Sequence, residues 1–417
     1  MSAADVVGQD KPTPPAETTP AGVATLYRRA LDNLKSGNLG VLPIALGIVF
    51  IVVFFSFKAT NFFTGNNFDN IIVQMAGTAM LAFGVVFVLL LGEIDLSISY
   101  VAGIGALTVA ELQLPGSGHE INGLLAMVAA VVICAAIGGA QGSIVAFVGV
   151  PSFVVTLAGF MIWQGVILQK LEQPGSIIIQ DRWINYTASY YFSDSAGWLI
   201  AGIIIAIYAV TVLGGVIGKR RAGVAIRSPG LVVAKLVGVA VAAFGVVAVS
   251  NHAKVPHGLP LAGVLVVIFL VILTFLAKRT TFGRHVYAVG GNAEAARRAG
   301  INVPRIRILV FMISSAMAAV GGIILAANVN SVDLNFGGGT LLLNAIAAAV
   351  IGGVSLFGGR GEVRAAFLGA LVIATVSNGL NTAGYATGVI YMVTGVILLF
   401  AVMLDTIARR LQVRSGR

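Results

Sequence analysis

Charged residues are scarce in this chain. Asp, Glu, Lys and Arg make up 10% of its 417 residues, whereas hydrophobic residues make up 58%. Ordinary soluble domains contain roughly 25% charged and roughly 45–50% apolar residues. The composition therefore excludes an ordinary soluble domain and indicates an integral membrane protein, whose lipid-facing surface carries almost no charge.

Residue types that build reactive sites are also few. Cys134 is the single cysteine, so a disulfide within the chain is impossible and a small core side chain is its expected role. The four histidines are scattered over loops on both sides of the membrane, which predicts no metal site and no cofactor. The sequence contains neither a Gly-x-x-x-x-Gly-Lys-Ser/Thr phosphate loop nor a Gly-x-Ser-x-Gly nucleophile motif. We therefore expect a transport protein that is not itself an enzyme.

Long apolar runs fill most of the sequence, and each can cross roughly 30 Å of hydrocarbon as a helix. They begin near residues 41, 71, 98, 124, 153, 198, 231, 259, 308, 341, 365 and 389. We predict an all-α polytopic membrane protein with roughly 10–12 transmembrane helices. The run at 341–356 is shorter and rich in glycine, so a half-helix or a re-entrant segment is the alternative there.

Lys and Arg predict the orientation, because positively charged loops stay in the cytoplasm. With twelve crossings and a cytoplasmic N-terminus, Lys58, Lys170, Arg182 and Lys254 are the basic residues left outside. Both termini are therefore expected in the cytoplasm of a cell whose inner or plasma membrane holds the chain. The basic residues are spread over several loops, so the net charge of +10 indicates topology and not nucleic-acid binding.

Composition also divides the chain into three parts. Residues 1–40 are polar and contain four prolines, which predicts a disordered cytoplasmic tail. Residues 41–408 form the expected transmembrane domain, and residues 409–417 form a short basic cytoplasmic tail.

A polar loop at residues 278–307 separates two of the apolar runs. Seven of its residues are Lys or Arg, and one is acidic. Inside it, residues typical of helix ends predict a very short helix: Asn292 as N-cap, Glu294 in the first turn, Arg297 and Arg298 in the last turn, and Gly300 as the left-handed stop. Such defined ends favour a rigid knob that a cytoplasmic partner contacts. The alternative is a solvated loop whose charges only set the topology.

Glu93 and Asp95 interrupt an almost continuous apolar stretch at residues 71–110. A charge at the bilayer centre costs at least about 2.5–3.5 kcal/mol on insertion scales. In a structural role, Asp95 or Ser97 would accept the free amides at the start of the following helix. Alternatively, the carboxylates line a water-filled vestibule or bind a coupling ion.

The other polar residues in the spans are neutral. The amides among them are Gln74, Gln141, Gln164, Asn344, Asn378 and Asn381. Amides in a helix bundle often only hydrogen-bond between helices, so a structural role competes with a role in transport. The candidates for a translocation pathway are Glu93, Asp95, Ser97, Gln164, Asn344 and Asn378. Hydroxyls and amides with few charges fit a neutral, hydroxyl-rich solute better than an ion.

Five glycines lie between residues 352 and 361. In a membrane bundle they favour a sharp turn or a close helix approach over a phosphate-binding loop. The tripeptides Gly-Glu-Ile at 92–94 and Gly-Glu-Val at 361–363 each follow an apolar run, a weak indication of an internal duplication.

Four motifs together cover most of the chain after residue 70. They are Gly-Glu-Ile-Asp-Leu-Ser at 92–97, Val-Pro-Ser-Phe-Val-Val-Thr-Leu-Ala-Gly at 150–159, the stretch at 281–301, and Ile-Gly-Gly-Val-Ser-Leu-Phe-Gly-Gly-Arg-Gly at 351–361. In these motifs the chain resembles the permease subunits of bacterial ABC importers for pentoses and related monosaccharides. The apolar hairpin at 231–276 resembles the xylose-type branch. One departure is Ser99, where such permeases usually carry glycine.

The resemblance implies a homodimeric or pseudo-twofold pore among membrane lipids, served by two further components. A cytoplasmic ATP-binding subunit would dock on the loop at 278–307, and an extracytoplasmic sugar-binding protein would deliver a monosaccharide such as xylose. Because selectivity would reside mainly in the binding protein, the sequence leaves the sugar open. The alternatives are a stand-alone secondary transporter that uses Glu93 or Asp95 for ion coupling, and a scaffold or channel with no energised step.

Overall fold

A computed structural model describes residues 42–116, 118–223, 229–254 and 257–414, so the predicted tail at 1–40 lies outside the described residues. Val41–Thr406 form one compact unit. Helices dominate the described chain, and its strands are limited to two short antiparallel pairs. The all-α prediction is confirmed.

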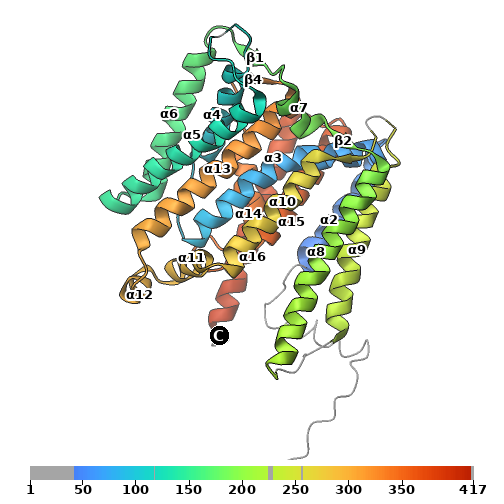
Figure 1. Ribbon diagram of the computed structural model, residues 1–417, viewed down its shortest axis with the longest axis vertical. Helices are drawn as coiled ribbons and strands as arrows, with labels where there is room; N and C mark the ends of the chain where they lie inside the picture. The colour runs from blue at the N-terminus through green and yellow to red at the C-terminus, as the bar shows by residue number, and fades with distance from the viewer. Residues whose placement is uncertain (1–41, 117, 224–228, 255–256, 415–417) are drawn as a thin grey trace, which may run out of the picture. The chain divides into compact units, whose positions relative to one another are not determined.

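Each predicted apolar run forms a helix (Figure 1). These helices are α2 (Leu42–Lys58), α3 (Gly65–Leu90), α4 (Ile98–Leu112), α5 (Gly123–Ser143), α6 (Ser152–Leu171), α8 (Asp194–Arg221), α9 (Pro229–Ser250), α10 (Leu261–Arg279), α13 (Val303–Val329), α14 (Leu341–Ile351), α15 (Val363–Thr382) and α16 (Thr387–Arg414). Among the described residues, eight helices are long and apolar enough to cross a bilayer, and the apolar parts of α2, α4, α14 and α16 are shorter. The chain is therefore a polytopic α-helical membrane protein.

The helices α14 and α16 differ in length from an ordinary span. At about 1.5 Å per residue, α14 is about 16 Å long, roughly half of the hydrocarbon thickness. It therefore has the length of the half-helix that the sequence offered as an alternative. The helix α16 continues to Arg414, so the residues assigned to a tail at 409–417 are helical up to that point, and 415–417 lie outside the described residues.

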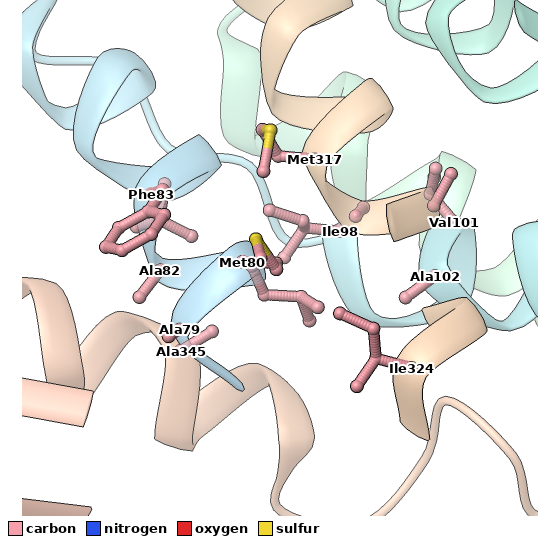
Figure 2. Packing of buried hydrophobic residues seen from close by; sticks show 14 of the residues in the cluster. Ala79, Met80, Ala82, Phe83, Ile98, Val101, Ala102, Met317, Ile324 and Ala345 are labelled. Carbon is pink, nitrogen blue, oxygen red and sulfur yellow. The ribbon is translucent and has the colours of Figure 1, made fainter. Parts of the chain in front are cut away.

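The centre of the unit is α13, which packs against α3, α4 and α5. Figure 2 shows the apolar side chains that fill this region, among them Met80 and Phe83 of α3, Ile98 of α4, and Met317 and Ile324 of α13. Small residues bring the backbones close together, as the glycines of α3 and α4 and the buried alanines of all four helices show. This is the packing expected where helices associate without a hydrophobic driving force from water.

The helices α8 and α9 pack against each other at the edge of the unit (Figure 1). Few residues in the apolar parts of these two helices are buried, and large side chains such as Leu199, Val210 and Val241 are exposed. In a membrane these apolar faces would contact lipid. By contrast, α10 packs against α3 and α15 in the core, and α9 also contacts α3.

The loops pair with one another at one end of the unit. The strands β1 (Ser176–Ile178) and β4 (Ser331–Asp333) form one antiparallel pair, and β2 (Tyr191–Phe192) and β3 (Leu259–Pro260) form another. Between them lies the short helix α7 (Arg182–Ser189). All of these segments are loops that the alternating topology places outside the cell, so their mutual contacts agree with that topology.

Three further elements complete the described chain. The π-helical turn η1 (Ile144–Val148) follows α5 and ends at Gly149, whose φ is +79°. At the opposite end from the strands, α11 (Thr281–Gly291) and α12 (Ala293–Arg298) lie in the segment between α10 and α13 (Figure 1). Cys134 is buried in α5, as its expected core role requires.

We expect the substitution Gly84→Val to destabilise the fold. A Cβ atom at Gly84 would stand 2.8 Å from the carbonyl oxygen of Ser314, whereas one at Gly202 in α8 meets nothing within 4 Å. Overpacking a dense interior typically costs about 1–3 kcal/mol. The thermal unfolding midpoint of the purified protein in detergent should fall for Gly84→Val and stay near the wild-type value for Gly202→Val. Equal midpoints would show that the α3–α13 contact does not limit stability.

Candidate coupling site and translocation pathway

The short helix α12 has the ends that its sequence predicts. The Asn292 side chain accepts a hydrogen bond from the Ala295 amide at 2.9 Å, and Gly300 adopts a φ of +83°. Glu294 forms ion pairs with Arg297 at 2.8 Å and Arg298 at 3.1 Å. Both arginine side chains are mostly exposed, whereas Ala296 is buried. The predicted helix is confirmed; its role in binding a partner stays a prediction.

The segment at 278–307 contains a second helix, α11, that the sequence analysis missed. Its N-cap is Thr280, whose hydroxyl oxygen accepts a hydrogen bond from the Gly283 amide at 3.1 Å. Gly283, Val286 and Val289 are buried on one face, at spacings typical of an amphipathic helix. The capping Thr280 and the spacing of the buried residues could have predicted this helix from the sequence. The segment is therefore a pair of short helices.

Two helix breaks lie close to this segment. The first break, residues 91–97, separates α3 from α4, and the second break, residues 352–362, separates α14 from α15. Gly92 in the first break and Gly353, Gly358 and Gly359 in the second adopt positive φ values between +73° and +85°. Gly353, Gly358 and Gly359 therefore form sharp turns, which the sequence favoured over a phosphate-binding loop, and Gly92 forms a similar turn in the first break.

An ion pair ties the segment to each break. The Arg307 Nε atom lies 3.1 Å from Glu93 Oε1 in the first break. The Lys278 Nζ atom lies 3.1 Å from Glu362 Oε1 at the end of the second break, and Arg364 lies 2.6 Å from the same carboxylate. Burial acts to raise the pKa of Glu362, but hydrogen bonds from Arg364 and Lys278 outweigh it, so its pKa lies below the ordinary value. Glu362 is therefore ionised at neutral pH.

Asp95 forms the centre of a buried polar cluster. Its Oδ1 atom accepts hydrogen bonds from the Ser97 amide at 3.0 Å and the Ser97 hydroxyl at 2.7 Å. Its Oδ2 atom accepts one from the Ser314 hydroxyl of α13 at 3.1 Å. All three side chains are almost fully buried. Asp95 thus accepts an amide at the start of α4, as the structural interpretation requires, and links this start to α13.

Gln141 of α5 joins the same cluster, with a side-chain oxygen 3.0 Å from the Ser97 hydroxyl oxygen. That hydroxyl has one proton, which the carboxylate of Asp95 attracts more strongly. If the oxygen and nitrogen of the Gln141 amide are exchanged, the NH2 group donates to the Ser97 hydroxyl oxygen. The Gln141 side-chain nitrogen, which is buried and otherwise has no partner among the described residues, then has one. The Ser97 and Ser314 hydroxyls then both donate to Asp95, and the Ser97 hydroxyl oxygen accepts from Gln141.

The remaining pathway candidates lie on other helices. Gln164 is half-buried on α6, Asn344 is half-buried on α14, and Asn378 is buried on α15. The Asn344 amide lies 3.4 Å from the Thr340 hydroxyl. Within the described residues, no hydrogen bond joins these three amides to one another or to Asp95, and the Asn344 and Asn378 side-chain oxygens lack partners. The assignment of a pathway to Glu93, Asp95, Ser97 and these amides stays a prediction.

Ser99, the departure from the resemblance described above, lies in the first turn of α4. It is buried, and its hydroxyl has no hydrogen-bond partner among the described residues. A Cβ atom at Gly337 would stand 2.7 Å from the carbonyl oxygen of Ser99, so the two backbones pack closely here. The extra hydroxymethyl group does not prevent close packing on the Gly337 side.

Comparison with known proteins identifies the family. The model of the branched-chain amino acid transport system / permease component family matches residues 67–402, a range that runs from α3 into α16 and includes both breaks. The chain belongs to this permease family. No solved structure matches it. As a member of the family with several membrane-spanning helices, it is a multi-pass membrane transport protein.

Curated relatives cover nearly the whole permease. The xylose transport system permease protein of Escherichia coli (strain K12) is 33% identical over 91% of this chain and 95% of its own length. The ribose import permease protein of the same strain is 29% identical over 86% of this chain and 92% of its own length. The D-allose transport system permease protein of the same strain is 27% identical over 92% of this chain and 98% of its own length.

Two substitutions of Asp95 should separate its structural role from ion binding. Asp95→Leu removes the acceptor of the Ser97 amide and of the Ser97 and Ser314 hydroxyls, and each unsatisfied buried group costs about 1–3 kcal/mol. We expect this permease variant to give little monodisperse protein on size-exclusion chromatography. Asp95→Asn keeps one acceptor oxygen, and we expect nearly normal yield and uptake. Abolished uptake at normal yield, with a shifted pH dependence, would instead favour ion binding.

Proposed function

We propose that this chain is the transmembrane permease subunit of an ATP-driven importer for a monosaccharide, most specifically xylose or a related pentose. The observation that carries the proposal is the nearly full-length similarity to a permease named for xylose transport. The ribose and allose permeases support the broader class of monosaccharides. The neutral amides Gln164, Asn344 and Asn378 fit weak contacts with a hydroxyl-rich solute.

The proposed importer requires a cytoplasmic ATP-binding subunit that docks on α12. Three features support this assignment. The helix has fixed ends, although a helix of its length is unstable alone in water. It presents the exposed charges of Arg297 and Arg298, and its buried Ala296 anchors it. It also lies in a segment that the distribution of Lys and Arg assigns to the cytoplasm. Asn292, Glu294 and Gly300 would keep this surface rigid.

The remaining parts of the importer follow from the same assignment. An extracytoplasmic sugar-binding protein would deliver the sugar to the end of the unit where α7 and the strand pairs lie. Two copies of the permease would enclose the pathway within membrane lipids. Closure of the ATPase would push on α12 and tilt the helices that flank the segment. Because ATP supplies the direction and the binding protein supplies the affinity, the permease needs only weak contacts with sugar.

The alternative function is a stand-alone transporter with Glu93 or Asp95 as the ion-coupling carboxylate. Such a site needs a carboxylate that can exchange its partner for a proton or cation. Glu93 already pairs with Arg307, and Asp95 is buried with Ser97 and Ser314. These partners favour structural roles for both carboxylates and so favour the importer.

The first test concerns the energy source. We expect proteoliposomes that hold the permease, its ATPase and its binding protein to accumulate D-xylose when ATP is supplied on the ATPase side. Proteoliposomes with the permease alone should not accumulate it under a proton or sodium gradient, because the proposed driving force is absent. Gradient-driven accumulation by the permease alone would refute the importer and support the ion-coupled alternative.

The second test concerns α12. Glu294→Lys places a positive charge at the positive end of the helix and removes its two ion pairs, and Ala296→Pro removes an amide from a helix of six residues. We expect normal membrane levels for both variants, with weakened co-purification of the ATPase and little sugar-stimulated ATP hydrolysis. Neither change lies in a membrane span, so insertion should be normal.

A matched control for this test is Glu111→Lys, which reverses the charge of another exposed, ion-paired glutamate at the opposite end of the unit. It should leave ATPase binding unchanged. If both α12 variants retained the ATPase at wild-type stoichiometry and transported normally, this segment would be the solvated loop of the alternative interpretation.

A further inference from the structure

Three segments that are far apart in the sequence meet through their backbones. They are the end of α3, the end of α11 and the turn in the second break. We call their meeting point the glycine junction and define it as Leu90, Gly92, Gly290, Gly358 and Gly359. The Gly359 amide donates a hydrogen bond to the Leu90 carbonyl oxygen at 2.8 Å. The junction thus connects both helix breaks with the segment at 278–307.

The absence of side chains makes these contacts possible. A Cβ atom at Gly290 would overlap the Leu90 carbonyl oxygen and stand 2.9 Å from the Gly359 amide nitrogen. A Cβ atom at Gly358 would stand 2.8 Å from the Gly290 carbonyl oxygen and 2.9 Å from the Gly92 nitrogen. Backbone atoms cannot move aside as a flexible side chain can. The end of α11 therefore cannot move toward either break without shifting the backbone of that break.

The two ion pairs flank this junction at the two ends of the segment. Arg307, at the start of α13, pairs with Glu93 of the first break. Lys278, at the end of α10, pairs with Glu362 of the second break, and Tyr287 of α11 donates a hydrogen bond to the Gly361 carbonyl oxygen at 2.7 Å. Each break thus supplies a Gly-Glu pair of residues to one end of the segment, which gives the weak sequence repeat a physical role.

We propose that the glycine junction and its two ion pairs are positioning elements that make α4 and α15 move together when the segment moves. This inference rests on the proposed function, because the movement would begin where an ATPase contacts α12. The first residue of α4 follows the first break directly, and the first residue of α15 follows Glu362. A single docking helix can therefore displace the starts of two core helices at once.

The neighbouring residues Gly290 and Gly291 offer a matched test. Both lie in the last turn of α11, but a Cβ atom at Gly291 meets nothing within 4 Å. Each variant, Gly290→Ala and Gly291→Ala, is reconstituted with the ATPase and the binding protein. D-xylose transported per ATP hydrolysed is then measured beside ATPase co-purification. We expect Gly290→Ala to lower this ratio by about tenfold, within the usual range of coupling between two sites, and to retain the ATPase. Gly291→Ala should match the wild type.

Charge variants keep the inference testable if Gly290→Ala fails to fold. Glu93→Gln and Lys278→Gln each remove one partner of an ion pair beside the junction. Their controls are Glu111→Gln and Lys170→Gln, which make the same changes in an exposed ion pair at the other end. We expect a lower transport-to-hydrolysis ratio only in the first two. The double variant Glu93→Arg with Arg307→Glu exchanges the two charges. It should transport more D-xylose per ATP hydrolysed than Glu93→Gln does.

The outcomes separate this inference from the function on which it rests. If the wild-type complex shows no ATP-dependent xylose uptake, the proposed function fails, and this inference fails with it. If the wild type transports and Glu93→Gln and Lys278→Gln keep its transport-to-hydrolysis ratio, the junction does not couple the breaks and the inference is wrong. Loss of ATPase binding in the same variants would also overturn it, because the residues would then act on docking.

Discussion

Buried backbone amides and carbonyls need hydrogen-bond partners, and at the first helix break residues from distant parts of the chain supply them. At the first break, the Ile94 amide donates to the Ser152 hydroxyl, and the Ile94 carbonyl accepts from the Thr156 hydroxyl. Asp95 accepts the Ser97 amide. Polar residues in these apolar stretches therefore have a structural purpose before any role in transport is considered.

The same constraint explains why separate sequence motifs belong together. Ser152 and Thr156 lie in the motif at 150–159, yet they satisfy the backbone of the motif at 92–97. The glycine-rich motif at 351–361 supplies the amide that satisfies Leu90, and the motif at 281–301 supplies Gly290 beside it. These motifs are thus parts of one arrangement around the first break, although they are distant in the sequence.

Local features were predicted well, and contacts between distant residues were not. The ends of α12 follow from capping residues within a few positions, and the apolar runs follow from the length of helix that a bilayer requires. The pairing of Glu93 with Arg307 and of Lys278 with Glu362 depends on the tertiary fold, so neither could be read from residue spacing. The same holds for Gln141 and Ser314 beside Asp95. In the candidate site, the sequence identified Glu93, Asp95 and the short helix α12, but not the side chains that pair with the two carboxylates.

The two kinds of contact around the segment differ in stiffness. Packed interiors resist compression, so backbone contacts such as Gly290 against Leu90 transmit a displacement with little loss. The Lys278–Glu362 ion pair is partly exposed, and exposed pairs contribute little to stability, so this pair can rearrange at small cost, whereas the Glu93–Arg307 pair is mostly buried. Glu362 already contacts two cations, Lys278 and Arg364. In the proposed movement, the stiff contacts at the centre would carry the displacement to both breaks, and Glu362 would keep one of its two cations as the segment tilts.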